Sequence, residues 1–175
     1  MTQIGLLGGD AREKILISLL ADKGYEVKVL HPSTCYDENV EYTTKIKEII
    51  DSCEVIVASM SGTDEDGYLK ATFVEDEVRL TGSFVDLLKK DQLFFIGIAR
   101  PELQEPLENK GINIIEMAKL NDVAILNAIP TAEGVIKEVI ERTDFTIYGS
   151  KILITGLGKV GLTLAWRFKA LGADT

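Results

Sequence analysis

The stretch that decides the fold is ITGLGKVGLTLAWRFKALGADT, residues 154–175. It opens with apolar residues of β character and continues with Gly156, Gly158 and Gly161 in the spacing G-x-G-x-x-G. In this pattern the first glycine makes a tight turn, the second lets a pyrophosphate approach the backbone, and the third lets a helix pack closely on the strand. Apolar residues then recur at helical spacing, at Leu162, Ala165, Phe168 and Leu171. The stretch therefore predicts a strand at 151–155, a dinucleotide-binding turn and a helix.

The predicted cofactor contacts are the six residues of that turn, Gly156, Leu157, Gly158, Lys159, Val160 and Gly161. The choice between NAD and NADP stays open, because the residue that reads the ribose ends the second strand, roughly 20 residues further on. Gly172 ends the helix, so Asp174 is expected at the start of that second strand and not at its end. We therefore expect a fragment: a first domain over residues 1–148, and the opening strand–helix unit of a truncated NAD(P)-binding domain over residues 149–175.

Apolar strands alternate with amphipathic helices in the first 148 residues. Strands are expected at 4–7, 25–30, 54–59, 93–98 and 112–116, and helices at 11–22, 43–51, 85–89, 101–109 and about 130–142. This alternation predicts an α/β fold with a doubly wound, mostly parallel open sheet, of the Rossmann-like or flavodoxin-like type. The first turn, Gly8-Gly9-Asp10, lacks the G-x-G-x-x-G spacing, which we call the dinucleotide fingerprint. The first domain is therefore predicted to be a substrate or cap domain.

Charge and composition exclude several classes of partner. The 175 residues carry a net charge of −9, and the stretch from Asp37 to Glu77 alone holds 12 acidic and 3 basic residues. Such a surface repels nucleic acid and anionic membranes. The sequence shows no basic, apolar leader and no run of about 20 apolar residues, so a cytoplasmic location is expected. Cys35 and Cys53 are expected to be reduced thiols, and with His31 as the only histidine no metal site is predicted.

Candidate substrate contacts follow the ends of the predicted strands, because ligands of open α/β sheets bind there. Arg12 follows the first strand and Arg100 follows the strand at 93–98. Each is a candidate for a bidentate contact with a carboxylate, or for a surface ion pair. Ser59 and Ser61, after the third predicted strand, offer hydroxyl groups that ordinary turn chemistry explains equally well.

A second group of candidates surrounds Pro130, where the sequence predicts the start of a helix. Asn127 and Thr131 are candidate substrate contacts, although Thr131 is also suited to cap the helix. Glu133 is a candidate catalytic group, and it is equally suited to interact with the helix dipole from the first turn. Both interpretations stay open for each residue.

Three stretches together resemble a known family. They are IGLLGGDAREK (4–14), NAIPTAEGVI (127–136) and TDFTIYGSKILITGLGKVGLTLAWRFKALGA (143–173), and the chain is similar over its whole length to the A subunits of dipicolinate synthase. The resemblance implies an oxidation of dihydrodipicolinate to dipicolinate during sporulation, with NAD or NADP as hydride acceptor. It also implies a dicarboxylate substrate and, as partner, a flavoprotein-like B subunit. Family members are longer, so this chain alone is expected to be inactive.

Two other functions remain open from the sequence. One is an oxidoreductase fragment related to the 2-hydroxyacid dehydrogenases, whose substrate domain also precedes a nucleotide domain. The other is a non-catalytic module that docks a partner through its acidic surface. The apolar positions Ile152, Ile154, Leu162 and Ala165 are expected to lack neighbours, so the C-terminal tail should be disordered, fold back, or form a homo-oligomer.

Overall fold

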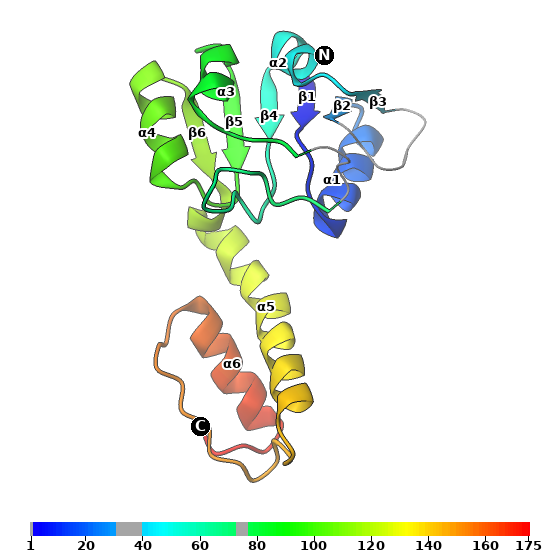
Figure 1. The fold of residues 1–175 in the computed structure, drawn as a ribbon. Coiled ribbons are helices and arrows are strands. Elements are labelled where there is room, and N and C mark those ends of the chain that lie inside the picture. Colours follow the sequence, from blue (N-terminus) through cyan, green and yellow to red (C-terminus); the bar gives the residue numbers. More distant parts are fainter. Residues whose placement is uncertain (1, 31–39, 73–76) are drawn as a thin grey trace. The chain divides into compact units, whose positions relative to one another are not determined.

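The structure, a computed structural model, describes residues 2–30, 40–72 and 77–175 (Figure 1). The chain forms two compact units, Met1–Ala118 and Lys119–Thr175. The predicted domain boundary after residue 148 lies inside the second unit. The boundary stays a prediction, because the division into compact units shows only which elements pack together.

The first unit is built on one six-stranded sheet in the order β3-β2-β1-β4-β5-β6. All neighbouring strands are parallel. The strands are β1 (Gln3–Leu6), β2 (Glu26–Leu30), β3 (Glu41–Thr43), β4 (Val55–Val57), β5 (Leu93–Ile96) and β6 (Asn113–Glu116). The predicted doubly wound parallel sheet is confirmed. Only β3 was not predicted, and the helix expected from residue 43 begins after it.

Helices cover the two faces of this sheet. They are α1 (Ala11–Asp22), α2 (Ile46–Ser52), α3 (Gly82–Leu87) and α4 (Pro101–Lys110), followed by the 3₁₀ turn η1 (Met117–Lys119). The larger core joins α2, α3 and α4 to one face and includes a ring contact between Phe84 and Phe94, with centroids 5.6 Å apart. The smaller core places Ile17 of α1 on the other face. Because both faces of the sheet are covered, the central strands β4 and β5 consist of continuous apolar residues.

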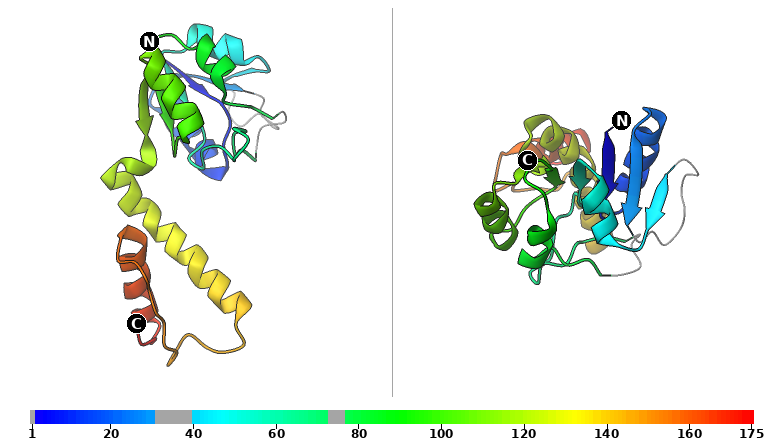
Figure 2. Two further views of the ribbon diagram at one scale, coloured as in Figure 1. Left: turned by 60° about the vertical axis from the view of Figure 1, so that its left-hand side comes forward. Right: turned by 90° about the horizontal axis from the view of Figure 1, so that it is seen from above.

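The second unit is a helical hairpin of α5 (Asn121–Arg142) and α6 (Lys159–Ala170), which lie side by side in Figures 1 and 2. A small core centred on Phe168 joins them. The predicted strand at 151–155 forms only one parallel bridge, between Lys151 and Asp174. None of the described residues pairs with the rest of this segment as a strand. The prediction that Asp174 begins a second strand stays a prediction.

The predicted helix start at Pro130 is wrong. The helix α5 begins at Asn121 and contains Pro130 in its interior. A proline removes one backbone N–H, but the residues on both sides remain helical here. The hydroxyl of Thr131 donates to the carbonyl of Asn127 at 2.7 Å, so it binds the preceding turn and does not cap a helix start.

The predicted exposure of the C-terminal tail is confirmed only in part. The side chains of Ile152 and Ile154 pack against the small core, whereas Leu162 is exposed. The most exposed apolar side chains of residues 149–175 are Leu153, at 88%, and Trp166, at 76%. The tail folds back, with α6 packed on α5, which is one of the three expected outcomes.

Two further expectations concern cysteines and membranes. Cys53 is a free, buried thiol, and burial raises its pKa. The predictions for His31 and Cys35 lie outside the described residues. Of the helices in the described ranges, none has the length and apolar character that a membrane span requires.

Candidate functional site

The strand order places a ligand-binding position between β1 and β4. The chain proceeds outward from β1 through β2 to β3, and then returns to β4 on the other side of β1. At such a switch point the loops that follow the two central strands diverge, and open α/β sheets bind ligands there. The relevant loops are residues 7–10, after β1, and residues 58–63, after β4; we call them the switch-point loops.

The first switch-point loop ends in a self-capped helix. Gly8 and Gly9 have φ values of 115° and 151°, which favour glycine. Asp10 caps α1, because its Oδ1 accepts a hydrogen bond from the backbone N–H of Arg12 at 3.0 Å. Glu13 completes a capping box by accepting from the backbone N–H of Asp10 at 2.7 Å. The start of α1 is thus satisfied by the chain's own carboxylates.

Glu13 also joins the two loops. Its side chain is buried, with the residue 4% exposed, and its Oε1 accepts from the backbone N–H of Met60 at 2.9 Å. A Cβ atom on Gly9 would stand only 2.3 Å from Cγ of Glu13, so the glycine leaves room for this side chain. Sequence analysis missed Glu13 as a site residue. The D-x-x-E capping pattern was visible, but it carries no signal of the contact with Met60.

Arg12 lies at the exposed side of the same junction. Its Nε and Nη2 donate to the two carboxylate oxygens of Asp10 at 3.0 and 2.7 Å, and Nη2 also donates to Oγ of Ser61 at 2.9 Å. The Arg12 guanidinium lowers the pKa of Asp10 to about 2, and Asp10 raises the pKa of Arg12. The arginine side chain is 47% exposed, and no hydrogen bond from its Nη1 to another described residue is present. Arg12 therefore keeps donors for an anionic ligand while Asp10 fixes its orientation.

The second switch-point loop is shaped by Ser59. This residue is fully buried, its hydroxyl accepts from the backbone N–H of Ser61 at 3.1 Å, and its carbonyl accepts from Gly62 and Gly97. Ser59 thus holds the loop, while the hydroxyl of Ser61 faces Arg12. The predicted roles of both serines in substrate binding stay predictions.

Arg100 is held by the same loop. It is the N-cap residue of α4, and its Nε donates to the carbonyl of Thr63 at 3.3 Å. The loop from Ser61 to Thr63 therefore contacts both predicted anchors, Arg12 and Arg100. Arg100 also lines a small pocket of about 220 Å³ whose acidic residues are Asp64, Glu65, Asp66 and Glu102. A second arginine, Arg79, lines the same pocket, so Arg100 lies among charges of both signs.

The remaining candidates from sequence lie on α5 in the second unit, whereas Arg12, Ser59, Ser61 and Arg100 lie in the first. Asn127 is half-buried, and Thr131 and Glu133 are exposed. The three residues lie on successive turns of one helix. Their predicted roles toward substrate stay predictions.

The turn that carries the fingerprint, residues 156–161, leads into α6; we call it the fingerprint turn. Gly158 is the N-cap residue, and no side chain caps the helix. A Cβ atom on Gly156 or Gly158 would meet open space, whereas one on Gly161 would stand 1.7 Å from the carbonyl oxygen of Gly156. The first two glycines therefore leave room outside the protein, and the third permits close packing of helix on turn. This arrangement fits the pyrophosphate of a dinucleotide at the start of a helix.

The other three residues of the turn are Leu157, Lys159 and Val160. Leu157 is exposed at the turn, and Val160 is exposed in the first turn of α6. The Nζ of Lys159 donates to Oδ1 of Asn121 at 2.8 Å, which ties the turn to the start of α5. All six predicted cofactor contacts thus belong to one strand–turn–helix junction.

Known proteins share both the sequence and the fold. The family model that describes the N-terminal domain of the dipicolinate synthase A subunit matches residues 3–118. This chain belongs to that family. It is 30% identical to the dipicolinate synthase A subunit of Bacillus subtilis over 178 residues, which cover 98% of this chain and 59% of the relative. The chain thus spans 59% of the length of that relative.

Solved structures agree with this assignment. The crystal structure of the dipicolinate synthase A subunit from Bacillus halodurans matches with a TM-score of 0.86 and 29% identity, over 98% of this chain and 59% of that one. The apo-structure of D-lactate dehydrogenase from Escherichia coli matches with a TM-score of 0.52 and 15% identity, over 98% of this chain and 53% of that one. The second likeness is one of fold alone.

Proposed function

We propose that this chain acts as part of the A subunit of a dipicolinate synthase, an NAD(P)-dependent oxidoreductase that converts dihydrodipicolinate to dipicolinate during sporulation. The observation that carries the proposal is the family match over residues 3–118, which include both switch-point loops. The dehydrogenase-like fold supports the same class of chemistry.

Arg12 is the proposed anchor for one carboxylate of the substrate. A dianion that approaches a chain of net charge −9 needs a local cation, and Arg12 has a fixed guanidinium with free donors at the ligand-binding end of the sheet. Ser61 contributes a hydroxyl beside it. Arg100 is proposed as the second anchor, held by the neighbouring part of the same loop.

The fingerprint turn is the proposed cofactor site. The backbone N–H groups at the start of α6 donate to the pyrophosphate of NAD or NADP, in the space that Gly156 and Gly158 leave open. When bound, the nicotinamide supplies the hydride acceptor. On α5, Asn127 and Thr131 are proposed to orient the substrate, and Glu133 to take the ring proton that leaves on aromatisation.

The proposal extends to partners and location. A flavoprotein-like chain, the B subunit of the enzyme, is the proposed partner, and the cytoplasm is the proposed location. A 2-hydroxyacid dehydrogenase remains the second candidate, because the D-lactate dehydrogenase fold is similar. The non-catalytic docking module is the third, on the basis of the acidic stretch.

The test uses a form of the protein with a complete cofactor-binding domain, supplied with the B subunit. Dipicolinate formation is measured for the wild type, Arg12→Ala and Arg100→Ala, with Arg142→Ala as the control, because Arg142 makes only an exposed pair on α5. Loss of a charge-assisted contact should weaken the apparent substrate affinity by about one to two orders of magnitude. Turnover of a 2-keto acid without dipicolinate formation would contradict the proposed reaction.

The same assay separates binding from proton transfer. We expect Glu133→Gln to abolish turnover and to leave the apparent substrate affinity unchanged. If both arginine variants keep normal affinity and rate, the anchor assignment fails, whatever the outcome for Glu133.

A further inference from the structure

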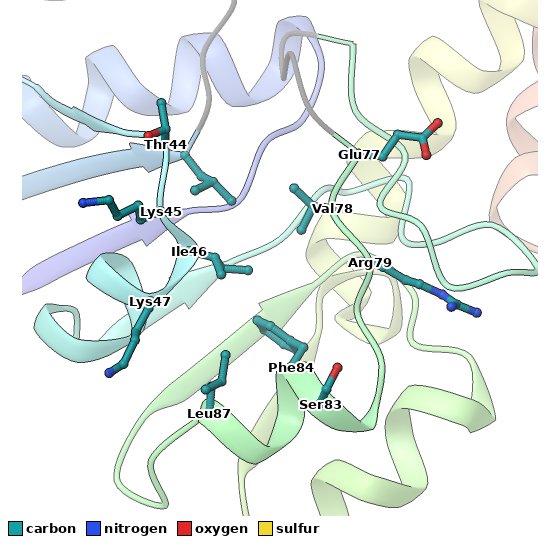
Figure 3. A pocket seen from close by; sticks show the side chains of 11 residues that line it. Thr44, Lys45, Ile46, Lys47, Glu77, Val78, Arg79, Ser83, Phe84 and Leu87 are labelled. Carbon is teal, nitrogen blue, oxygen red and sulfur yellow. The ribbon is translucent and has the colours of Figure 1, made fainter.

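The first unit contains a second hollow that the proposed function does not use. It has a volume of about 700 Å³ and lies among the start of α2, the helix α3 and the connection that leads into α3 (Figure 3). None of its lining residues belongs to the switch-point loops. The volume falls within the range of about 300–1,000 Å³ that is typical of small-molecule sites.

The walls of this hollow are apolar. In Figure 3 the labelled side chains of Ile46, Val78, Phe84 and Leu87 border the same space, and Leu30 at the end of β2 completes the apolar lining. Phe84 and Val78 are buried in the core, whereas Leu87 is 42% exposed. Apolar surface that remains in contact with water favours the burial of an apolar ligand.

Three basic residues line the hollow, and in Figure 3 the side chains of Lys45 and Lys47 point away from its apolar walls. Lys45, Lys47 and Arg79 line it together with one acidic residue, Glu77. The stretch from Asp37 to Glu77 contains only 3 basic residues against 12 acidic ones, and two of those three are Lys45 and Lys47. Basic side chains thus gather at an apolar hollow inside the most acidic part of the chain. This charge distribution complements a ligand with an apolar body and one negative group.

The lysines are able to exchange their present partners for a ligand. Lys45 pairs with Glu48 at 3.1 Å and Lys47 pairs with Asp51, and both pairs are exposed. Exposed pairs contribute little to stability, so replacing Glu48 by a ligand carboxylate costs little. Lys45 and Lys47 flank Ile46 of the apolar wall, and both have flexible stems. Lys45 is the N-cap residue of α2 and has an extended backbone, whereas Lys47 lies within the helix, so Lys45 is the better placed of the two to turn toward a ligand.

Arg79 is less mobile than the lysines. Its Nε donates to the carbonyl of Asp66 at 2.8 Å, and its guanidinium lies over the ring of Tyr68, 5.4 Å from the centroid. In Figure 3 its side chain points away from the apolar walls. Arg79 therefore contributes positive potential, while Lys45 is the group that is free to turn toward a ligand.

We propose that this hollow binds a monocarboxylate with an apolar body, whose carboxylate pairs with Lys45 and whose body packs on Ile46, Phe84 and Leu87. The site is distinct from the proposed dicarboxylate site at Arg12. This proposal goes beyond the proposed function and does not depend on it.

The test adds 2-naphthoate, a rigid apolar ring system with one carboxylate, to the ¹⁵N-labelled 175-residue chain. Saturable shifts are expected in the amide resonances of Ile46, Phe84 and Leu87. Lys45→Glu should weaken binding roughly tenfold, because it replaces an attractive charge with a repulsive one. Lys137→Glu is the matched control, since Lys137 also forms an exposed pair with an acid on its own helix, and it should bind like the wild type.

The apolar half of the proposal has its own test. Leu87→Gln should weaken the binding of 2-naphthoate by roughly tenfold, because it removes apolar contact at a position that is already part exposed and so tolerates the change. Leu126→Gln, at an exposed apolar position on α5, is the control and should have no effect. The neutral amide, 2-naphthamide, should bind the wild type about tenfold more weakly than the carboxylate.

Three results would overturn the proposal. The first is the absence of saturable shifts, or shifts at the switch-point loops or along α5 and α6 in place of the hollow. The second is equal affinity of Lys45→Glu and Lys137→Glu. The third is displacement of 2-naphthoate by dipicolinate, which would make the hollow part of the dicarboxylate site. The first two results leave the proposed function untouched, and dipicolinate formation by the longer enzyme is measured in a separate assay.

Discussion

At two junctions of the chain a glycine-rich turn leads into a helix, and the two helix starts are capped differently. At the first, Gly8-Gly9-Asp10 leads into α1, and the free N–H groups of the helix are met by carboxylates of the chain itself. At the second, Gly156 to Gly161 leads into α6, and no side chain caps the helix. The space beside Gly9 is filled by Glu13, whereas the space beside Gly156 and Gly158 is open.

This difference bears on where a phosphate group would fit. A helix N-terminus attracts negative charge, because its N–H groups are unpaired and its dipole is positive there. Where Asp10 and Glu13 supply that charge, the side chain of Glu13 fills the space beside Gly9 and the N–H groups of Asp10 and Arg12 are already paired. At the start of α6 no side chain supplies negative charge, so an anionic ligand has room to do so. The contrast explains physically why the first junction lacks the fingerprint and the second has it.

The largest expected effect is at the first junction. Glu13→Ala leaves the backbone N–H groups of Asp10 and Met60 without their acceptor, so the free energy of unfolding of the first unit should fall by about 2–4 kcal/mol. Urea denaturation followed by circular dichroism measures the change. Glu105→Ala, at an exposed position on α4, is the control and should stay within about 0.5 kcal/mol of the wild type. Equal stability of the two variants would show that Glu13 does not hold the loops.

The second junction should respond differently to each of its glycines. Gly161→Ala forces a Cβ atom against the carbonyl of Gly156 and should cost about 1–3 kcal/mol, seen as loss of α6 helicity at lower urea concentration. Gly158→Ala meets open space, so it should cost less than about 1 kcal/mol, the usual penalty of alanine at an N-cap position. A larger loss for Gly158→Ala than for Gly161→Ala would mean that protein atoms fill that space.

The ion pair of the first junction predicts a pH dependence. Arg12 lowers the pKa of Asp10 to about 2, below its value of about 3.9 in unfolded chains. A lowered pKa in the folded state contributes stability that is fully present above about pH 4 and is lost as the pH falls toward 2. Because both side chains are partly exposed, we expect a contribution of about 1 kcal/mol.

The matched variant for this pH effect is Asp10→Asn, which still caps α1 but carries no charge. The stability difference between wild type and variant, from urea denaturation, should shrink from pH 6 to pH 2. A difference that does not change with pH would show that the pair with Arg12 contributes nothing.

The smallest expected effect concerns nucleotide binding by the 175-residue chain. The described residues provide the glycine-rich turn, and Asp174 forms a single bridge with Lys151. In this class of fold the residue that reads the ribose ends the second strand. Calorimetry with NAD, NADH, NADP and NADPH should therefore find no micromolar site. At millimolar NADPH, amide shifts are expected at Gly156, Gly158 and Lys159 and not at Gly8 or Gly9. A micromolar site, or equal shifts at both junctions, would remove the distinction between them.

Local patterns were sufficient for much of the fold. The bounds of α1 agree with the predicted helix at 11–22, because Asp10 and Glu13 form a capping box within four residues and the apolar spacing repeats every turn. The helix α4 begins at Pro101 for a similarly local reason. The same local rule was wrong at Pro130, where packing of α5 on α6 continues a helix that already began at Asn121.

The sequence by itself determined the α/β alternation and the dinucleotide fingerprint, since each depends on residues only a few positions apart, and the alternation in turn predicted a parallel sheet. The tertiary structure alone decided which side chains meet at the switch point. Glu13 reaches Met60 across 47 positions and Arg12 reaches Ser61 across 49. These contacts exist because the return of the chain to β4 sets it beside β1, and no periodicity within either segment carries information on that pairing. The three-residue strand β3 was missed for the same reason: it is a strand only because it pairs with β2.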